Sequence, residues 1–573
     1  MTLKLDLADI QGNLLSAYGR IGFPTARCVL LHVNEGKSNL ACKFLNELRF
    51  KVTTAELWQS SKTKNADPTH VIPKKPNIAI NVAFTFNGLV ALGVPVRTLR
   101  SMPEEFQEGM LARSIILNDA PNPNITVEEI WDHVWTNERN DKSKEVHILV
   151  TFNVNSAAPA GALDHEYNWL VDNCGDDKGV KILAGHRGPS KYYQDISAIM
   201  AVNQDQTLTP TSKEHFGFTD GIGDPVFEGQ VFDINNPQEA LKKKAIGQGK
   251  LNPDQTWSPL ATGEFLLGHP DESQEIAGFA MPIDFSRNGT FMAYRKIHQN
   301  PQAFSDYIAK VALIYSQTTG LSVEQADETI RAKMAGRWSD GIPLMKAPTY
   351  SDWQALHAQF NDKCNLIKSN KSLNEQQIED QINSLRNDIL VNFTYSSDLD
   401  GSKCPFSSHL RRSNPREMLD PATPTPGFST QPTKSSSATS AVSQKSSSIL
   451  NNRHRILRRG LPYGKSGPGI ADSEEHGILM MTVCSSLFRQ FEFIQQQWLQ
   501  YGLDFNSGND TCPLLGNHDD EAKFVIPADA NSGKPPFICD QLPQFVETRG
   551  GAYFFIPSMT SLRMIAEGLV DPT

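Results

Sequence analysis

The sequence predicts an α+β protein, with strands in two clusters and helices between them. Three observations support this fold class. Short segments rich in β-branched and aromatic residues lie in the first 155 residues and again near the end of the chain. Amphipathic patterns, with apolar residues three and four positions apart, lie between these two clusters. The length of 573 residues and the hydrophobic content of 39% allow a core of useful size.

The strand candidates are short and are bounded by polar turns. They lie at 27–34, 78–86 and 145–154 in the first cluster, and at 476–486 and 551–559 in the second. Helices are predicted at 301–317, 323–336, 372–390 and 490–502.

Two segments have the composition of insertions. A helical insertion is expected at about 345–391, where the helix at 372–390 is polar with a narrow apolar stripe. A Ser/Thr/Pro-rich stretch from Pro421 to about residue 450 has few groups to bury, and we interpret it as a flexible excursion.

Composition narrows the classes of function. The formal net charge of -10 argues against a nucleic-acid backbone as the main partner. The sequence contains no run of eighteen apolar residues, so no membrane-spanning helix is expected. The eight cysteines form no CxxC pair, which argues against zinc and favours reduced, mostly buried thiols. The first residues match no export signal, so the cytoplasm is the expected compartment, with non-classical export left open.

An acidic residue stands in an apolar, glycine-rich stretch, HFGFTDGIGDPVFEG, at 215–229. Asp220 lies between Gly217 and Gly221, and glycine lets the backbone turn sharply and approach a bulky group. The carboxylate could cap a turn, bind a metal or transfer a proton. Asp224 precedes Pro225, and we expect it to set the turn.

A histidine with small and basic neighbours lies in CPFSSHLRRSNPRE, at 404–417. Ser407 and Ser408 leave room for a large group beside His409. Three arginines follow the histidine: Arg411, Arg412 and Arg416. This pattern suits haem, whose iron binds imidazole and whose acid groups bind arginine. The alternative is a basic surface loop.

The third stretch is NNRHRILRRGLPYG, at 451–464. If it is a strand, Ile456 and Arg458 face one side, while the other side carries Arg455, Leu457 and Arg459. Arg458 could then enter an apolar site and bind an anion there. The alternative is a basic patch for a phosphate or an acidic partner.

Together these stretches resemble the dye-decolorizing peroxidase (DyP-type) family of haem enzymes. GFTDG matches the family's GxxDG motif, CPFSSHLRRSNPR matches CPF-x-x-H-[IL]-R-R-x-N-P-R, and RILRRGLPYG matches R-I-x-R-R-G-x-P-[YF]-G. The similarity extends from about Asp9 to about Ala566, and the two insertions leave the motifs intact.

The resemblance implies a peroxidase that uses haem b and hydrogen peroxide to oxidise dyes, phenolics and other donors through a ferryl intermediate. His409 is implied as the proximal iron ligand and Asp220 as the distal acid and base. Arg458 is implied as the distal cation, which stabilises developing charge and favours the ionised form of Asp220. An aspartate in this role predicts activity that favours acidic pH.

Further site residues are expected from the same resemblance. Arg411 would bind an acid group of haem, and Ile478 and Met480 would contribute apolar walls to the distal pocket. Trp498 is a candidate for electron transfer from the surface; its alternative role is as a helix residue packed in the core.

The implied fold is a pair of ferredoxin-like domains of the dimeric α/β-barrel type, at 1–215 and 216–573, with haem in the second. A homodimer is left open. Three rival functions are also left open: a haem-binding or haem-iron-handling protein with incidental peroxidase activity, an interaction protein without a site, and a flavin or metal enzyme unrelated to haem.

Overall fold

The computed structural model describes residues 4–59, 72–120, 124–276, 281–420, 446–467, 469–505, 507–508, 510–528 and 532–570. The sequence 421–445, which makes up most of the Ser/Thr/Pro-rich excursion, lies outside the described residues. Within these ranges, no helix combines the length and the apolar character that crossing a membrane requires.

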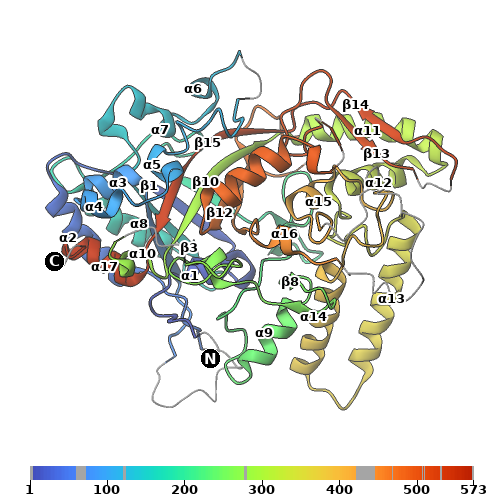
Figure 1. Ribbon diagram of the computed structural model, residues 1–573, viewed down its shortest axis with the longest axis horizontal. Coiled ribbons are helices and arrows are strands. Elements are labelled where there is room, and N and C mark those ends of the chain that lie inside the picture. The colour runs from blue at the N-terminus through green and yellow to red at the C-terminus, as the bar shows by residue number, and fades with distance from the viewer. Residues whose placement is uncertain are drawn as a thin grey trace, which may run out of the picture.

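A nine-stranded sheet runs through the middle of the molecule and consists of two half-sheets (Figure 1). The strands follow the order β11-β12-β10-β15-β2-β3-β1-β4 across the sheet, and β5 also pairs with β1. The first half holds β1 (Thr25–Val33), β2 (Ile78–Phe84), β3 (Ile148–Val154), β4 (Val180–Ile182) and β5 (Gln194–Ser197). The second half holds β10 (Thr290–Gln299), β11 (Leu457–Gly464), β12 (His476–Cys484) and β15 (Val546–Ile556).

Every pairing in this sheet is antiparallel, and the strands of the two halves pair at Phe84 and Phe555. At the other edges of the halves, β11 also contacts β5. The α+β class with antiparallel strands is therefore confirmed. One hydrophobic cluster contains side chains from both halves, such as Val29 and Phe291. The division into two domains at residue 215 stays a prediction. Three two-stranded sheets complete the strands: β6 (Met200–Val202) with β7 (Leu208–Pro210), β8 (Lys250–Leu251) with β9 (Trp257–Ser258), and β13 (Lys523–Ile526) with β14 (Phe537–Asp540).

The two long helices predicted between the strand clusters are present as α11 (Pro301–Thr319) and α12 (Val323–Ala335). Each is followed by a glycine in the left-handed conformation, Gly320 or Gly336, which ends the helix without steric cost. Ser322 begins α12 with a capping box. The two helices contact each other and lie at the upper right of Figure 1, beside β13 and β14.

The predicted helical insertion is a hairpin of α13 (Tyr350–Ser369) and α14 (Glu375–Val391), which projects from the body at the lower right of Figure 1. The helix expected at 490–502 starts earlier and is π-helical, in two segments, Leu487–Glu492 and Ile494–Leu499. The remaining α-helices are α1 (Gly12–Leu15), α2 (Ser38–Leu48), α3 (Phe86–Ala91), α4 (Val96–Leu99), α5 (Glu104–Glu108), α6 (Val127–Ile130), α7 (His133–Thr136), α8 (Ala162–Asp172), α9 (Pro237–Ala245), α10 (Ile283–Ser286), α15 (His409–Ser413), α16 (Ile449–Asn452) and α17 (Met559–Glu567).

Candidate active site

A cavity of about 320 Å³ lies against one face of the second half-sheet. Its volume is within the range of about 300–1,000 Å³ that ligand pockets occupy. Because side chains alternate along a strand, every second residue of β10, β12 and β15 reaches it. These wall residues are Arg295, Ile297, Gln299, Ile478, Met480, Thr482, Val546 and Thr548. Both predicted apolar residues, Ile478 and Met480, are thus on the cavity wall.

The segment 214–225 forms another wall of the cavity and carries Asp220. Gly217 and Gly221 have φ angles of 93° and 73°, a region in which a side chain would be strained. The main-chain N–H of Asp220 donates to the carbonyl of Ser212 at 2.6 Å. Its carboxylate accepts a hydrogen bond from Gly221 N–H at 2.6 Å and contacts the guanidinium of Arg458. The glycines therefore bring a carboxylate into an apolar cavity, where an arginine balances its charge.

Arg458 lies on β11 and points into the cavity, while its neighbours Leu457 and Arg459 point away from it. Leu457 is buried in the core, and Arg459 is bound to Asp224 at 3.3 Å. The side chains of Arg458 and Asp220 are each exposed by about a third, at 37% and 36%. Desolvation lowers the pKa of Arg458 to about 10, so the guanidinium stays charged at neutral pH.

The alternation predicted for 455–459 is correct from Ile456 onward and wrong for Arg455. Arg455 precedes the strand and lines the cavity together with Ile456 and Arg458. Its guanidinium donates to the carbonyls of Gly249 at 3.1 Å and Gln248 at 3.2 Å.

His409 is the first residue of α15 and lines the same cavity. Its Nδ1 lies 3.3 Å from Sγ of the buried Cys512. The structure thus brings an imidazole, a carboxylate and a guanidinium, from three distant parts of the sequence, to one cavity.

The structure gives Arg411 a different role from the predicted contact with a cofactor. Arg411 is 1% exposed and is absent from the cavity wall. Its guanidinium donates to the Asp398 carboxylate at 2.7 Å and to the carbonyl of Cys404 at 2.6 Å. Tyr395 and Phe406 stack against it. This arginine is a buried structural cation with its own counter-ion.

The proposed surface position of Trp498 is also wrong, and the alternative, a core residue, is correct. Trp498 is 1% exposed and packs against His454, Phe493 and Phe505. Its indole N–H donates to Asp504 at 3.0 Å.

Besides Arg455, three charged residues of the cavity were missed as candidates: Glu214, Arg295 and Arg337. Arg337 donates to the carbonyls of Gly341 and Leu390, and desolvation lowers its pKa to about 10. Glu214 is buried and accepts hydrogen bonds from Phe216 N–H, Phe218 N–H and the Gln299 amide, which fix the start of the segment that carries Asp220. Arg337 lies within the region of family resemblance, from about Asp9 to about Ala566, and this was the available signal.

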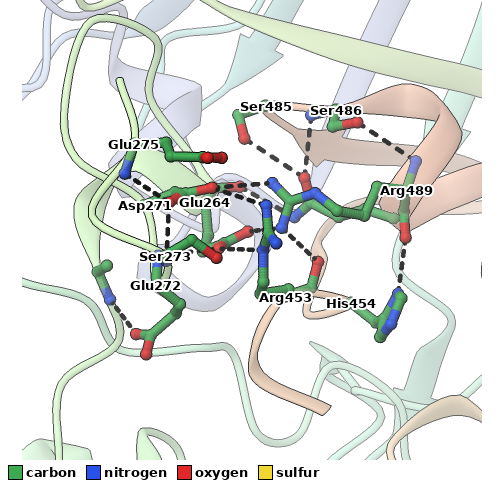
Figure 2. Close-up of polar contacts among 12 residues, drawn as sticks. Glu264, Asp271, Glu272, Ser273, Glu275, Arg453, His454, Ser485, Ser486 and Arg489 are labelled. Carbon is green, nitrogen blue, oxygen red and sulfur yellow. Dashed lines mark hydrogen bonds and ion pairs between the residues drawn. The ribbon is translucent and has the colours of Figure 1, made fainter. Parts of the chain in front are cut away.

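A network of ion pairs braces the backbone next to Arg455 and Arg458 (Figure 2). Glu264 is fully buried and pairs with Arg489 at 2.8 Å, while Asp271 pairs with Arg453 at 3.0 Å. The carbonyl of Arg489 lies 2.7 Å from Nδ1 of His454. The network therefore ties the segment before β11 to the π-helical segments, which also contribute to the cavity wall.

Comparison with known proteins shows similarity along most of the chain. A dye-decolorizing peroxidase of Mycena epipterygia is 23% identical over 98% of this chain and 87% of its own length. Dye-decolorizing peroxidase AauDyP1 of Auricularia auricula-judae is 26% identical over 86% of this chain and 76% of its own length. Peroxidase 2 of Mycetinis scorodonius is 26% identical, but the match spans only 56% of that protein. No family model matches the chain.

Solved structures show the same fold. A dye-decolorizing peroxidase in complex with 2,6-dimethoxyphenol has a TM-score of 0.65 at 21% identity, over 98% of this chain and all of the other. A fungal DyP-type peroxidase from Auricularia auricula-judae has a TM-score of 0.64 at 19% identity, with the same coverage. The chain is therefore similar to DyP-type peroxidases over nearly its whole length and shares their fold.

Proposed function

We propose that the protein is a haem-dependent peroxidase that reduces hydrogen peroxide with electrons from dyes, phenolics and other small aromatic donors. One observation carries this proposal: the Asp220–Arg458 pair and the His409 imidazole line a single apolar cavity. The printed names of the relatives support it, and one solved relative holds a phenol, 2,6-dimethoxyphenol.

The residues of the cavity fit haem b. His409 would bind the iron, since Nδ1 is occupied by Cys512 and leaves Nε2 for a metal. Arg337 and Arg455 would hold the acid groups, because among the described residues both guanidinium groups bond only to main-chain carbonyls. Ile478 and Met480 would contact the apolar ring.

When bound, haem would supply the redox-active iron for the reduction of peroxide and the oxidation of the donor. Asp220 then performs the proton transfers: its carboxylate takes a proton from one peroxide oxygen and returns it to the oxygen that leaves as water. Arg458 offers a fixed positive charge beside that carboxylate, stabilises the charge that develops on the leaving oxygen and favours the ionised form of Asp220.

The test is the rate at which the haem-loaded protein reacts with peroxide, together with steady-state turnover of a phenol or dye. Asp220→Asn should slow the peroxide reaction about 10²–10⁴-fold, the usual contribution of general acid–base catalysis. Asp224→Asn changes a carboxylate on the same segment and should have a much smaller effect. Haem binding without turnover in the wild type would instead favour a haem-binding or haem-iron-handling protein.

A further inference from the structure

The contact behind the His409 ring gives a second functional residue. Cys512 is one of eight free cysteines, is fully buried, and is not part of the cavity wall. Its Sγ lies 3.3 Å from Nδ1 of His409, while the ring itself faces the cavity. Sulfur and nitrogen at this distance are within hydrogen-bonding range.

The backbone holds the sulfur in place. The N–H of Cys512 donates to the carbonyl of Leu499 at 2.7 Å, and its own carbonyl accepts from Gly516 N–H at 2.9 Å. The same carbonyl lies 3.1 Å from Nε2 of His518.

The turn that precedes Cys512 is hydrogen-bonded to α15, the helix that carries His409. Arg412 donates to the carbonyl of Asp510 at 2.6 Å, so α15 and the Cys512 segment are linked twice. The position of Sγ relative to the ring is therefore set by groups other than His409.

A neutral imidazole has one N–H and one lone pair, and the partner of one nitrogen decides which is which. We infer that Cys512 is a positioning residue, whose sulfur accepts the Nδ1 proton of His409 and so turns the Nε2 lone pair toward the cavity. This inference rests on the proposed function for its purpose, because an iron ligand needs that lone pair. The opposite arrangement, with the thiol donating to Nδ1, would leave an N–H facing the cavity.

The identity of the partner also has a consequence for the metal. A thiol is a weak hydrogen-bond acceptor, and a carboxylate is a strong one. Cys512 therefore orients His409 while adding little electron density to it. Cys512→Asp should make the imidazole more electron-donating and lower the reduction potential of bound haem.

The first test uses haem-free protein and ¹⁵N-histidine NMR, which distinguishes the two tautomers; His409→Gln identifies the His409 signals. Wild type and Cys512→Ser should show one tautomer, with the proton on Nδ1. Cys512→Ala should show a mixture. Cys539→Ala is the matched control, because Cys539 is buried in the same hydrophobic cluster but lies on β14, whereas Cys512 is the cysteine beside His409. A proton on Nε2 in wild type, or a Cys512→Ala spectrum identical to wild type, would overturn the inference.

The second test uses the haem-loaded protein. The iron–histidine stretching frequency of the ferrous form should rise in Cys512→Asp and fall in Cys512→Ala, while Cys539→Ala keeps the wild-type value. The dissociation constant of haem should increase about tenfold in Cys512→Ala, the lower end of what loss of such a partner costs. Equal frequencies in all variants would overturn the inference. Failure of the wild type to bind haem would instead refute the proposed function, and the tautomer measurement would still decide the role of Cys512.

Discussion

Replacing His215 by glutamine is expected to make the fold more resistant to acid. His215 begins the segment that carries Asp220, and its Nε2 lies 3.0 Å from the carbonyl of Tyr463. Burial is the main cause that lowers the pKa of His215 from 6.5 to about 4, and the nearby His476 and His298 contribute to the same shift. The carboxamide of glutamine can still donate to Tyr463 but takes up no proton.

The direction of the pKa shift of His215 decides whether acid stabilises or destabilises the fold. Since the pKa of His215 is lower in the folded protein than in the unfolded chain, the unfolded chain binds the proton more readily. The stability that neutral His215 contributes is complete above pH 6.5 and is lost as the pH falls toward 4. With these two pKa values, the linkage relation gives a loss of about 2 kcal/mol at about pH 5.

The assay is urea-induced unfolding of wild type and His215→Gln at about pH 7.5 and about pH 5. The difference in unfolding free energy between the two proteins should shift by about 2 kcal/mol in favour of the variant at the lower pH. His165→Gln, on the exposed side of α8, controls for the chemical change itself. A difference that is the same at both pH values would refute the reasoning. The result bears on function, because a peroxidase that favours acid would work where its fold weakens.

Three other predictions follow from buried charges. Glu264→Ala should lower the unfolding free energy by about 3 kcal/mol in urea titrations. Among the described residues, Arg489 then keeps a hydrogen bond to the carbonyl of Arg453 at 3.1 Å, but its remaining carboxylate contact, to Asp271, is 3.8 Å long. An unchanged midpoint would contradict the network of Figure 2. Arg411→Leu should lower the unfolding free energy by about 3–5 kcal/mol, since the buried carboxylate of Asp398 loses the arginine that neutralises it and keeps only main-chain N–H donors, yet folded molecules should bind haem as wild type does. Arg455→Met should weaken haem binding about tenfold or more in spectral titrations, and full affinity would exclude it as an anion-holding group.

Much of the sheet could be predicted because its strands are short, apolar and bounded by turns. The strand β10 was missed, and its residues explain why. Arg295 and Lys296 look like surface residues in the sequence, but both are buried, paired with Asp119 and Asp132. Charge pairing of this kind depends on segments 160 or more positions away, and no local pattern contains it.

The sequence predicted those site residues that belong to a family motif. It did not predict which way the side chains of adjacent residues point. Asp220, His409 and Arg458 all reach the cavity. Arg411 follows His409 by two residues on α15. Two residues correspond to a rotation of roughly 200° about the helix axis, so the Arg411 side chain points away from the face that carries the His409 imidazole. Nothing in the sequence marks which of the consecutive arginines faces which way, since that depends on Asp398.

The balance of charge in the cavity bears on what it holds. Asp220 offsets Arg458, but Arg337 and Arg455 have no carboxylate partner within the described parts of the chain. Desolvation lowers their pKa values to about 10 and about 9, so both remain cations at neutral pH. A buried cation without a counter-ion is costly, and an anionic ligand offsets that cost. A neutral or purely apolar ligand would not offset the cost of burying these two cations. The wall thus favours a ligand that carries acid groups as well as a large apolar surface and a site for imidazole, which is the chemical description of haem.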